Sequence, residues 1–266
     1  MTLFDDESDL PLPKPRCRVR MTIAYDGTGF SGFPVQPGGV KTLAGALGEA
    51  IGKILKHPVR FTVAGRTDAG VHAWGNVAHF DSPRYPDEID LAKLQRALNK
   101  MLKPKIVVRD AAIAEEGFDA RYSAIARRYR YTVLNRTVPD PFQHATTWLI
   151  DEPLDLRAMQ LACDPLLGEH DFSSFCKKPL SAKGSNIRRL HDARWIDLGD
   201  GKLRFDIEAS SFCQQMVRSM VGTLVDVGLG RTRAGDLSWI LRSMDRNAAG
   251  APAPAHGLCL WEVVYP

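Results

Sequence analysis

The chain has 266 residues, of which 44% are hydrophobic and 25% charged, as expected for a globular protein large enough to form two lobes with separate cores. The net charge is +4, and the first nine residues hold four acidic and no basic side chains, so the remainder carries +8, which favours a polyanionic partner. No apolar run approaches the ~20 residues that cross a bilayer, and the acidic N-terminus is unlike a signal peptide, so we expect a cytoplasmic protein without a membrane segment. The five cysteines are widely spaced and form no C-x-x-C pair, which argues against a disulfide framework and against a zinc site.

The first part of the sequence predicts a short tail followed by a lobe of strands and helices. Residues 1–15 are acidic and then proline-rich, which is typical of disordered segments. Apolar and polar residues alternate over residues 18–25, a pattern that predicts a half-buried strand. Helices are expected after Thr42 and Asp90, because both residue types cap helix N-termini and apolar side chains recur at helical spacing behind them. We assign this N-terminal lobe to residues 16–114.

A second lobe, assigned to residues 115–266, shows a similar order of strands and helices. In its first predicted strand, residues 128–133, Tyr129 shares a face with Tyr131 and Val133, while arginines point to the other face. Helices are expected near residues 155–167 and over residues 212–227, where Arg218 lies at the edge of the apolar arc. Further strands are expected near residues 203–209 and 258–265. We therefore expect an α+β protein with two similar lobes that share a mostly antiparallel central sheet, with a cleft between the lobes.

The most informative segment is the glycine-bounded loop Gly65-Arg66-Thr67-Asp68-Ala69-Gly70, which stands between an apolar run and an alternating run. A strand–loop–strand arrangement presents the single carboxylate of Asp68 at the edge of a cleft, where it can act as a nucleophile. Arg66, two residues earlier, would favour the charged form of that carboxylate. The alternative is a salt bridge between Arg66 and Asp68 that only fixes the turn.

Several basic residues stand in short clusters, for which the sequence alone allows two interpretations. They could contact phosphates, or they could be the solvated faces that charge clusters usually form. Tyr129 stands between arginines, so a base could stack on its ring, although a core tyrosine is the plain alternative. The clusters are Arg127 to Arg130, Lys177 with Lys178, Arg188 with Arg189, and Arg231 with Arg233.

The Asp68 loop, read on to His72, is similar to the G-R-T-D-A-G-V-H signature of the TruA family of tRNA pseudouridine synthases. Four further blocks resemble motifs of that family in the same order along the chain. They are residues 118–131 (F-H-A-R-F-S…R-Y-R-Y, with Asp119 and Tyr122 replacing the usual His and Phe), 166–175, 212–222 (F-x-x-x-M-V-R-x-x-V-G) and 254–258. The chain departs from the family pattern at Phe33-Pro34, where Trp-Gln is usual, and at Cys176-Lys177, where an Arg often stands.

This resemblance implies the pseudouridine synthase fold and an isomerase that converts uridine to pseudouridine in the anticodon stem-loop of tRNA, at positions 38 to 40. It implies Asp68 as the catalytic nucleophile, Tyr129 as a substrate-contacting residue, and Arg218 as the arginine that reaches the active-site carboxylate, with Arg66 beside it. It also implies a homodimer in which one tRNA touches both protomers, and an enzyme that needs neither a metal nor a cofactor.

Two other classes of function are weighed against this expectation. An RNA-binding or RNA-folding module could keep the fold without turnover, but it would have no need of a carboxylate such as Asp68 near the RNA. A glycosidase-type hydrolase would need two carboxylates, placed as acid and nucleophile, and only Asp68 stands in an obvious cleft motif. The histidines lack metal-ligand spacing, and the glycines form neither a dinucleotide-binding motif nor a P-loop, so no metal and no nucleotide cofactor are expected.

Overall fold

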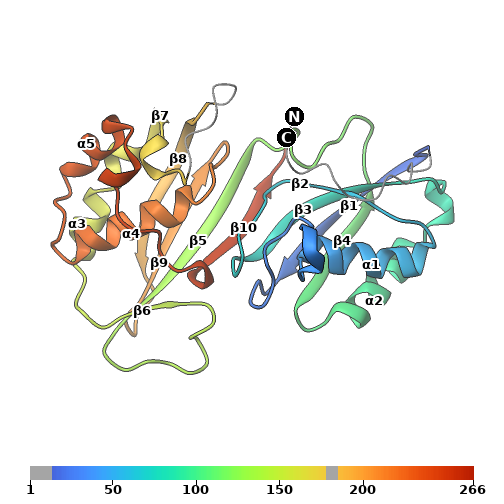
Figure 1. Ribbon diagram of the computed structural model, residues 1–266, viewed down its shortest axis with the longest axis horizontal. Coiled ribbons are helices and arrows are strands. Elements are labelled where there is room, and N and C mark those ends of the chain that lie inside the picture. The colour runs from blue at the N-terminus through green and yellow to red at the C-terminus, as the bar shows by residue number, and fades with distance from the viewer. Residues whose placement is uncertain (1–13, 178–184) are drawn as a thin grey trace. The chain divides into compact units, whose positions relative to one another are not determined.

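The computed structural model describes residues 14–177 and 185–266, which belong to two compact units that follow each other along the chain (Figure 1). The first unit ends at Ala124 and the second begins at Ile125. Residues 114–123 belong to the first unit because they are bonded back to it: Ala114 N donates to Arg18 O at 2.8 Å, and Ala120 N donates to His79 Nδ1 at 3.0 Å.

The N-terminal unit consists of antiparallel strands in the order β4-β1-β3, with the short strand β2 paired to β3. Two helices lie along one side of these strands (Figure 1). The elements are β1 (Cys17–Tyr25), α1 (Leu43–Leu55), β2 (Phe61–Val63), β3 (His72–Ser82), α2 (Leu91–Leu102) and β4 (Ile106–Ile113).

Both helices of this unit begin at the residues that the sequence predicts. Thr42 Oγ1 accepts a hydrogen bond from Gly45 N at 3.2 Å, and Asp90 Oδ1 accepts one from Lys93 N at 2.8 Å. Such caps satisfy backbone N–H groups that have no partner inside the helix, and each typically contributes about 1 kcal/mol. The apolar side of α1, with Leu47 and Ile51, is fully buried.

The C-terminal unit holds the strand order β10-β5-β9-β8-β7, with neighbours antiparallel and the short β6 parallel to β5. Its first and last strands are neighbours, and Tyr131 of β5 lies opposite Leu258 of β10. The elements are β5 (Ala126–Asn135), β6 (Trp148–Ile150), α3 (Leu156–Leu161), β7 (Gly168–Asp171), β8 (Ile187–Asp197), β9 (Lys202–Ala209), α4 (Met216–Gly228), α5 (Asp236–Ser243) and β10 (Leu258–Val264).

Helix α4 is the central helix of this unit, since every residue in it except Arg218 and Asp226 is buried. The sequence predicted it from residue 212, but it begins at Met216, because Gln215 adopts a left-handed conformation with a φ of 62°. The helix expected over residues 155–167 likewise ends at Leu161 and is followed by a separate 3-10 turn, Asp164–Leu166.

The expected α+β class with mostly antiparallel strands is confirmed, whereas the cleft between the lobes stays a prediction. In the part of the chain that the structure describes, no helix is both long enough and apolar enough to cross a membrane. The tail assigned to residues 1–15 lies almost entirely outside the described residues.

Candidate active site

Asp68 lies in the loop that joins β2 to β3 in the N-terminal unit. A tight turn closes this loop, with Val71 N donating to Asp68 O at 3.1 Å. Asp68 itself is partly exposed, while the preceding residue, Thr67, is buried. The backbone of the loop is therefore anchored in the protein, and the carboxylate remains within reach of solvent.

Three buried side chains hold the loop in place through hydrogen bonds. The hydroxyl groups of Tyr25 and Thr67 share a hydrogen bond of 2.8 Å. Asn76 Nδ2 donates to the Tyr25 hydroxyl at 3.0 Å and to the carbonyl oxygen of Gly65 at 2.9 Å. Tyr25 belongs to β1 and Asn76 to β3, so this network ties Gly65 and Thr67, the two neighbours of Arg66, to the sheet. Because these groups are out of water, each bond stabilises one loop geometry.

The segment at residues 32–33 supports the loop from another side. Gly32 has a φ of +100°, and a Cβ at this position would lie 2.9 Å from Thr67 O, so only glycine fits without displacing the loop. Phe33 N donates to Thr67 O at 3.1 Å, and its ring is buried with its centroid 6.1 Å from that of Tyr25. Phe33, which stands where the family usually has Trp, is therefore a core residue beneath the Asp68 loop.

The far end of the loop is fixed at His72. Its Nδ1 accepts a hydrogen bond from Gly27 N at 3.1 Å and lies 3.2 Å from Asp26 Oδ1. Partial burial alone would raise the pKa of Asp26, but a hydrogen-bonded ion pair with Lys105 and hydrogen bonds from Thr28 outweigh it and lower the pKa to about 2.

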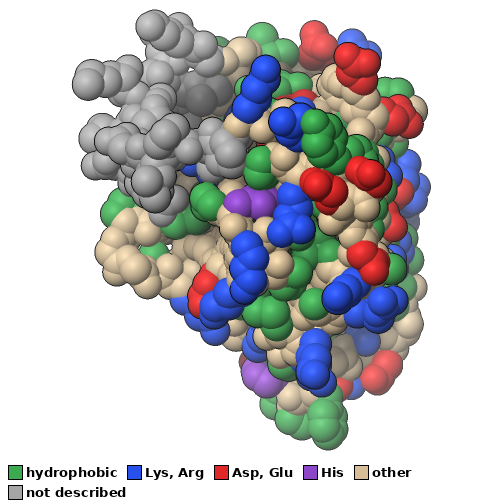
Figure 2. All heavy atoms as spheres, turned by 90° about the vertical axis from the view of Figure 1, so that its right-hand side faces the viewer, with side chains coloured by type: hydrophobic (Ala, Val, Ile, Leu, Met, Phe, Trp, Pro, Cys, Tyr) green, Lys and Arg blue, Asp and Glu red, His purple; other side chains and the backbone are tan. Residues whose placement is uncertain are grey.

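Arg66 does not form the salt bridge that was the plain alternative for this loop. Its side chain is exposed, and within residues 14–177 and 185–266 it makes no hydrogen bond or ion pair. Some other basic side chains of this unit are paired, such as Arg18 with Asp81 at 2.7 Å, and Figure 2 shows Lys and Arg interspersed with carboxylates over one face of it. The hydrogen-bonding groups of Arg66 are therefore open to a ligand.

Tyr129 lies in β5 of the C-terminal unit, on the buried face that the sequence predicted. It is 8% exposed, and its ring meets that of Phe212 edge-on, with centroids 5.1 Å apart and planes at 84°. Edge-to-face contacts of this kind are favourable for aromatic pairs. Phe212 precedes α4, so this contact connects the Tyr129 strand to the start of the helix that carries Arg218.

The arginines on either side of Tyr129 are already engaged by acidic side chains. Arg128 forms ion pairs with Glu208 at 2.6 Å and with Glu262 at 2.7 Å. Arg130 lies 3.6 Å from Asp206 and stacks over the ring of Trp261. The third arginine of the cluster, Arg127, is buried and donates to Ser210 O at 2.8 Å, so all three guanidinium groups are already bonded within the protein. Of the other clusters, Arg189 lies near Glu169 and Arg231 near Glu152, while Lys178 lies outside the described residues.

Arg218 projects from the first turn of α4 and is held by the extended segment before β10. Its Nε donates to Ala253 O at 2.7 Å, and Ala253 N donates back to Arg218 O at 2.9 Å. The same segment lies against Gly222, where any Cβ would overlap the carbonyl group of Ala251. This two-way bonding gives the guanidinium a defined direction.

Tyr131, two residues after Tyr129, is a structural residue near Arg218. It is fully buried, and its hydroxyl donates to Pro254 O at 2.9 Å. Burial raises its pKa, and the nearby positive charge of Arg218 acts in the opposite direction. Within the C-terminal unit, Tyr131 therefore links the strand of Tyr129 to the segment that orients Arg218.

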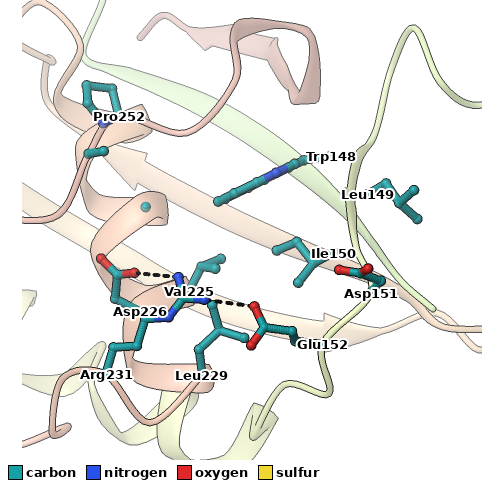
Figure 3. Close-up of a pocket in the computed structure, with 12 residues that line it drawn as sticks. Trp148, Leu149, Ile150, Asp151, Glu152, Val225, Asp226, Leu229, Arg231 and Pro252 are labelled. Carbon is teal, nitrogen blue, oxygen red and sulfur yellow. Dashed lines mark hydrogen bonds and ion pairs between the residues drawn. The ribbon is translucent and has the colours of Figure 1, made fainter. Parts of the chain in front are cut away.

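A separate pocket of about 330 Å³ lies in the C-terminal unit between β6 and the second half of α4 (Figure 3). Trp148, Val225 and Leu229 form its apolar walls. Its charges are mutually paired: Arg231 lies 2.7 Å from Glu152 and 3.8 Å from Asp226. None of the residues predicted to act in catalysis lines this pocket, so it is not the candidate active site.

Sequence reasoning found the loop but missed its supports. Tyr25, Asn76 and Phe33 lie outside the loop motif, and a tyrosine or asparagine in a strand gives no sign of its partner. The signal that could have indicated a supported loop is the buried polar residue of a strand, Asn76, within an otherwise apolar run. No group of three or more His, Cys, Asp or Glu side chains is placed to hold a metal in the described ranges 14–177 and 185–266.

Comparison with known proteins identifies the class to which this fold and this loop belong. The family model described as tRNA pseudouridine synthase matches residues 21–123 and 162–266, so its two parts fall in the two units of the structure. The chain belongs to this family, whose members are isomerases.

The individual relatives agree with that assignment over nearly their whole length. The chain is 42% identical over 249 residues to tRNA pseudouridine synthase A of Exiguobacterium sibiricum, covering 94% of this chain and 97% of the relative. It is 39% identical over 250 residues to tRNA pseudouridine synthase A of Bacillus subtilis, covering 93% and 99%. It is 41% identical over 251 residues to that of Frankia casuarinae, covering 94% and 89%.

Proposed function

We propose that this protein converts uridine to pseudouridine in the anticodon stem-loop of tRNA, at positions 38 to 40, with Asp68 as the nucleophile. The observation that carries the proposal is a partly exposed carboxylate on a loop anchored by Tyr25, Thr67 and Asn76, in a chain of the tRNA pseudouridine synthase family. A nucleophile must be held rigidly and must still reach a ligand, and this loop meets both conditions.

The reaction needs no net change of atoms or charge. The target uridine leaves the helical stack and reaches the carboxylate. Asp68 attacks the nucleotide, the glycosidic bond to N1 breaks, and the uracil turns within the site. The base then rejoins the sugar through C5 as the bond to the Asp68 carboxylate breaks. C5 loses its proton and N1 gains one. Exclusion of water keeps the intermediate from being hydrolysed.

The remaining site residues have distinct proposed roles. Tyr129 packs on the extruded base, and its hydroxyl assists removal of the C5 proton. Arg218 is the cationic partner of the Asp68 carboxylate, which its fixed bond to Ala253 supports, because an oriented guanidinium loses little freedom on pairing. Arg66, exposed and without a protein partner in the described residues, is proposed to contact the RNA backbone.

We further infer a cytoplasmic homodimer whose two protomers both contact one tRNA. The family resemblance suggests it. Two apolar side chains in the connection between β5 and β6 could be covered by a second chain: Phe142 is 95% exposed and Val138 is 67% exposed. Light scattering should give the mass of two chains for the wild type and of one chain for Phe142→Asp. A wild-type mass of one chain would contradict the dimer.

Tritium release from tRNA labelled at uracil C5 tests the activity itself. Wild-type protein should release tritium, and Asp68→Asn should abolish release while tRNA binding persists, because the amide keeps the shape and removes the nucleophile. Asp110→Asn, at an exposed carboxylate of β4, is the matched control and should leave turnover unchanged. If Asp68→Asn turned over at the wild-type rate, the nucleophile assignment would be wrong. If the wild type bound tRNA without turnover, the protein would be a binding module.

A further inference from the structure

Two cysteines of the C-terminal unit lie side by side and have no role in the proposed reaction. Cys176 follows the 3-10 turn Ser173–Phe175, and Cys213 precedes α4. A backbone hydrogen bond of 3.1 Å from Lys177 N to Gln214 O holds together the residues that follow each cysteine. The two thiols are close enough that each affects the ionisation of the other. The two cysteines therefore stand on adjoining segments, and a disulfide requires that their Cα atoms lie within about 7 Å.

The surroundings of the two sulfur atoms fix this arrangement. The Cys213 sulfur lies 3.4 Å from Asn186 Oδ1, and Asn186 Nδ2 donates to Ser173 Oγ at 3.0 Å. The Cys176 sulfur lies 3.2 Å from the carbonyl oxygen of Phe172. Three separate segments of the unit thus meet at the thiol pair, so the positions of both sulfur atoms are set by the packing of the fold.

The two thiols differ in access and in acidity. Cys176 is buried, at 1% exposed, whereas Cys213 is partly exposed. The neighbouring Cys176 thiol, with help from Arg188 and against burial and Asp171, lowers the pKa of Cys213. The Cys213 thiol and burial together raise the pKa of Cys176. Cys213 is therefore the thiol that reacts first, because it is accessible and more readily forms the thiolate that acts as the nucleophile.

We propose that Cys176 and Cys213 form a reversible dithiol–disulfide site whose oxidant is a small-molecule disulfide such as oxidised glutathione. The Cys213 thiolate attacks one sulfur of the oxidant, a mixed disulfide forms, and one glutathione thiolate leaves. Cys176 then gives up its proton and attacks the Cys213 sulfur, which releases the second glutathione. The protein loses two electrons and two protons, and the oxidant gains both as two free thiols.

The position of this site connects it to the residues described above. Phe212 is the chain neighbour of Cys213, and its ring packs on Tyr129. A disulfide at residue 213 would tether the short segment between β9 and α4, which carries Phe212. The thiol pair is therefore placed where a change of redox state acts directly on the packing around Tyr129.

Peptide mapping of the full-length protein tests the proposal. The protein is incubated with oxidised glutathione, free thiols are blocked with N-ethylmaleimide, and disulfides are located by mass spectrometry. We expect a Cys176–Cys213 disulfide in the wild type and in the control Cys17→Ser, which alters a partly exposed cysteine outside the pair. In Cys176→Ser the glutathione should remain on Cys213, because the resolving sulfur is missing. In Cys213→Ser, Cys176 should stay unmodified.

The pH dependence of alkylation of Cys213 by iodoacetamide is an independent readout. In the wild type the rate should rise with a midpoint below the ordinary cysteine value of ~8.5, because the pKa of Cys213 is lowered. Cys176→Ala removes the neighbouring thiol and should move the midpoint toward that ordinary value, so that the rate at neutral pH falls.

Three results would overturn the proposal. One is a folded wild-type protein that forms no Cys176–Cys213 disulfide in excess oxidised glutathione. The second is glutathione spread equally over Cys17 and Cys213 in Cys176→Ser. The third is an alkylation midpoint that is the same in the wild type and in Cys176→Ala, which would show that the Cys213 thiol does not depend on its neighbour.

Discussion

Removal of a single hydroxyl group, that of Tyr25, should loosen the Asp68 loop and lower the stability of the protein. In Tyr25→Phe the ring stays in place, but Thr67 loses its partner and Asn76 Nδ2 loses one of its two acceptors. All three side chains are at most 5% exposed, so water does not readily replace the lost bonds. A buried polar group left without a partner costs about 1–3 kcal/mol, and we expect the free energy of unfolding to fall by about 2 kcal/mol.

Urea denaturation of the full-length protein measures this change. The matched control is Tyr85→Phe, since Tyr85 is half-exposed and its hydroxyl is bonded only at the surface, to Arg16; the free energy of unfolding should change by less than ~0.5 kcal/mol. A double-mutant cycle of Tyr25→Phe with Thr67→Val should give a coupling energy of about 1 kcal/mol, because both changes remove the same bond. Turnover of tRNA by Tyr25→Phe should fall as well. Stability and turnover both equal to the wild type would show that the network does not hold the loop.

Three further predictions concern charge, stacking and pH. In filter-binding assays, Arg66→Ala should reduce the slope of log affinity for tRNA against log salt by about one unit, whereas Arg128→Ala should leave the slope unchanged because Glu208 and Glu262 already neutralise that arginine. Equal slopes for both variants would contradict this distinction. In single-turnover assays, Tyr129→Phe should bind tRNA normally but react far more slowly, and Tyr129→Leu should also lose binding by about 1–3 kcal/mol of stacking; wild-type rates in both would make Tyr129 an ordinary core residue. The pKa of Asp26 is lowered to about 2 in the folded protein, so its contribution to stability is complete above its unfolded pKa of ~3.9 and is lost as the pH falls through about 2. The free energy of unfolding of Asp26→Asn should therefore fall less steeply than that of the wild type as the pH is lowered between these two values. The same pH dependence in both proteins would contradict the pairing of Asp26 with Lys105.

The parts of the fold that could be predicted from the sequence are those governed by local patterns. The strand over residues 18–25 and the helix caps at Thr42 and Asp90 follow from alternation and from capping chemistry, and the structure confirms them. Strand β8 and helix α5 were not predicted, because their periodicity is masked by charged residues. The late start of α4 depends on the left-handed conformation of Gln215, a residue that gives no such signal in a sequence.

In the candidate site, too, the features that follow from local sequence patterns could be predicted and the long-range contacts could not. Arg66 and Asp68 are found from their motif, and the alternation around Tyr129 correctly gives its buried face. What could not be predicted is long-range: the Tyr25–Thr67–Asn76 network joins three segments that are distant in sequence, and the ion pairs of Arg128 join β5 to β9 and β10. Contacts of this kind depend on strand register, which local patterns do not specify.

The pairing of β5 with β10 has a consequence for synthesis on the ribosome. The pairs of β1 with β3 and β4 lie within residues 17–113, so they can form while the later part of the nascent chain is still being made. Strand β5 follows at once, but β10 emerges more than a hundred residues later. Until Leu258 to Val264 have left the exit tunnel, one edge of β5 stays unpaired and open to misassociation with other chains. Translation that stalls before Leu258 would therefore leave an exposed strand edge on an otherwise largely assembled polypeptide.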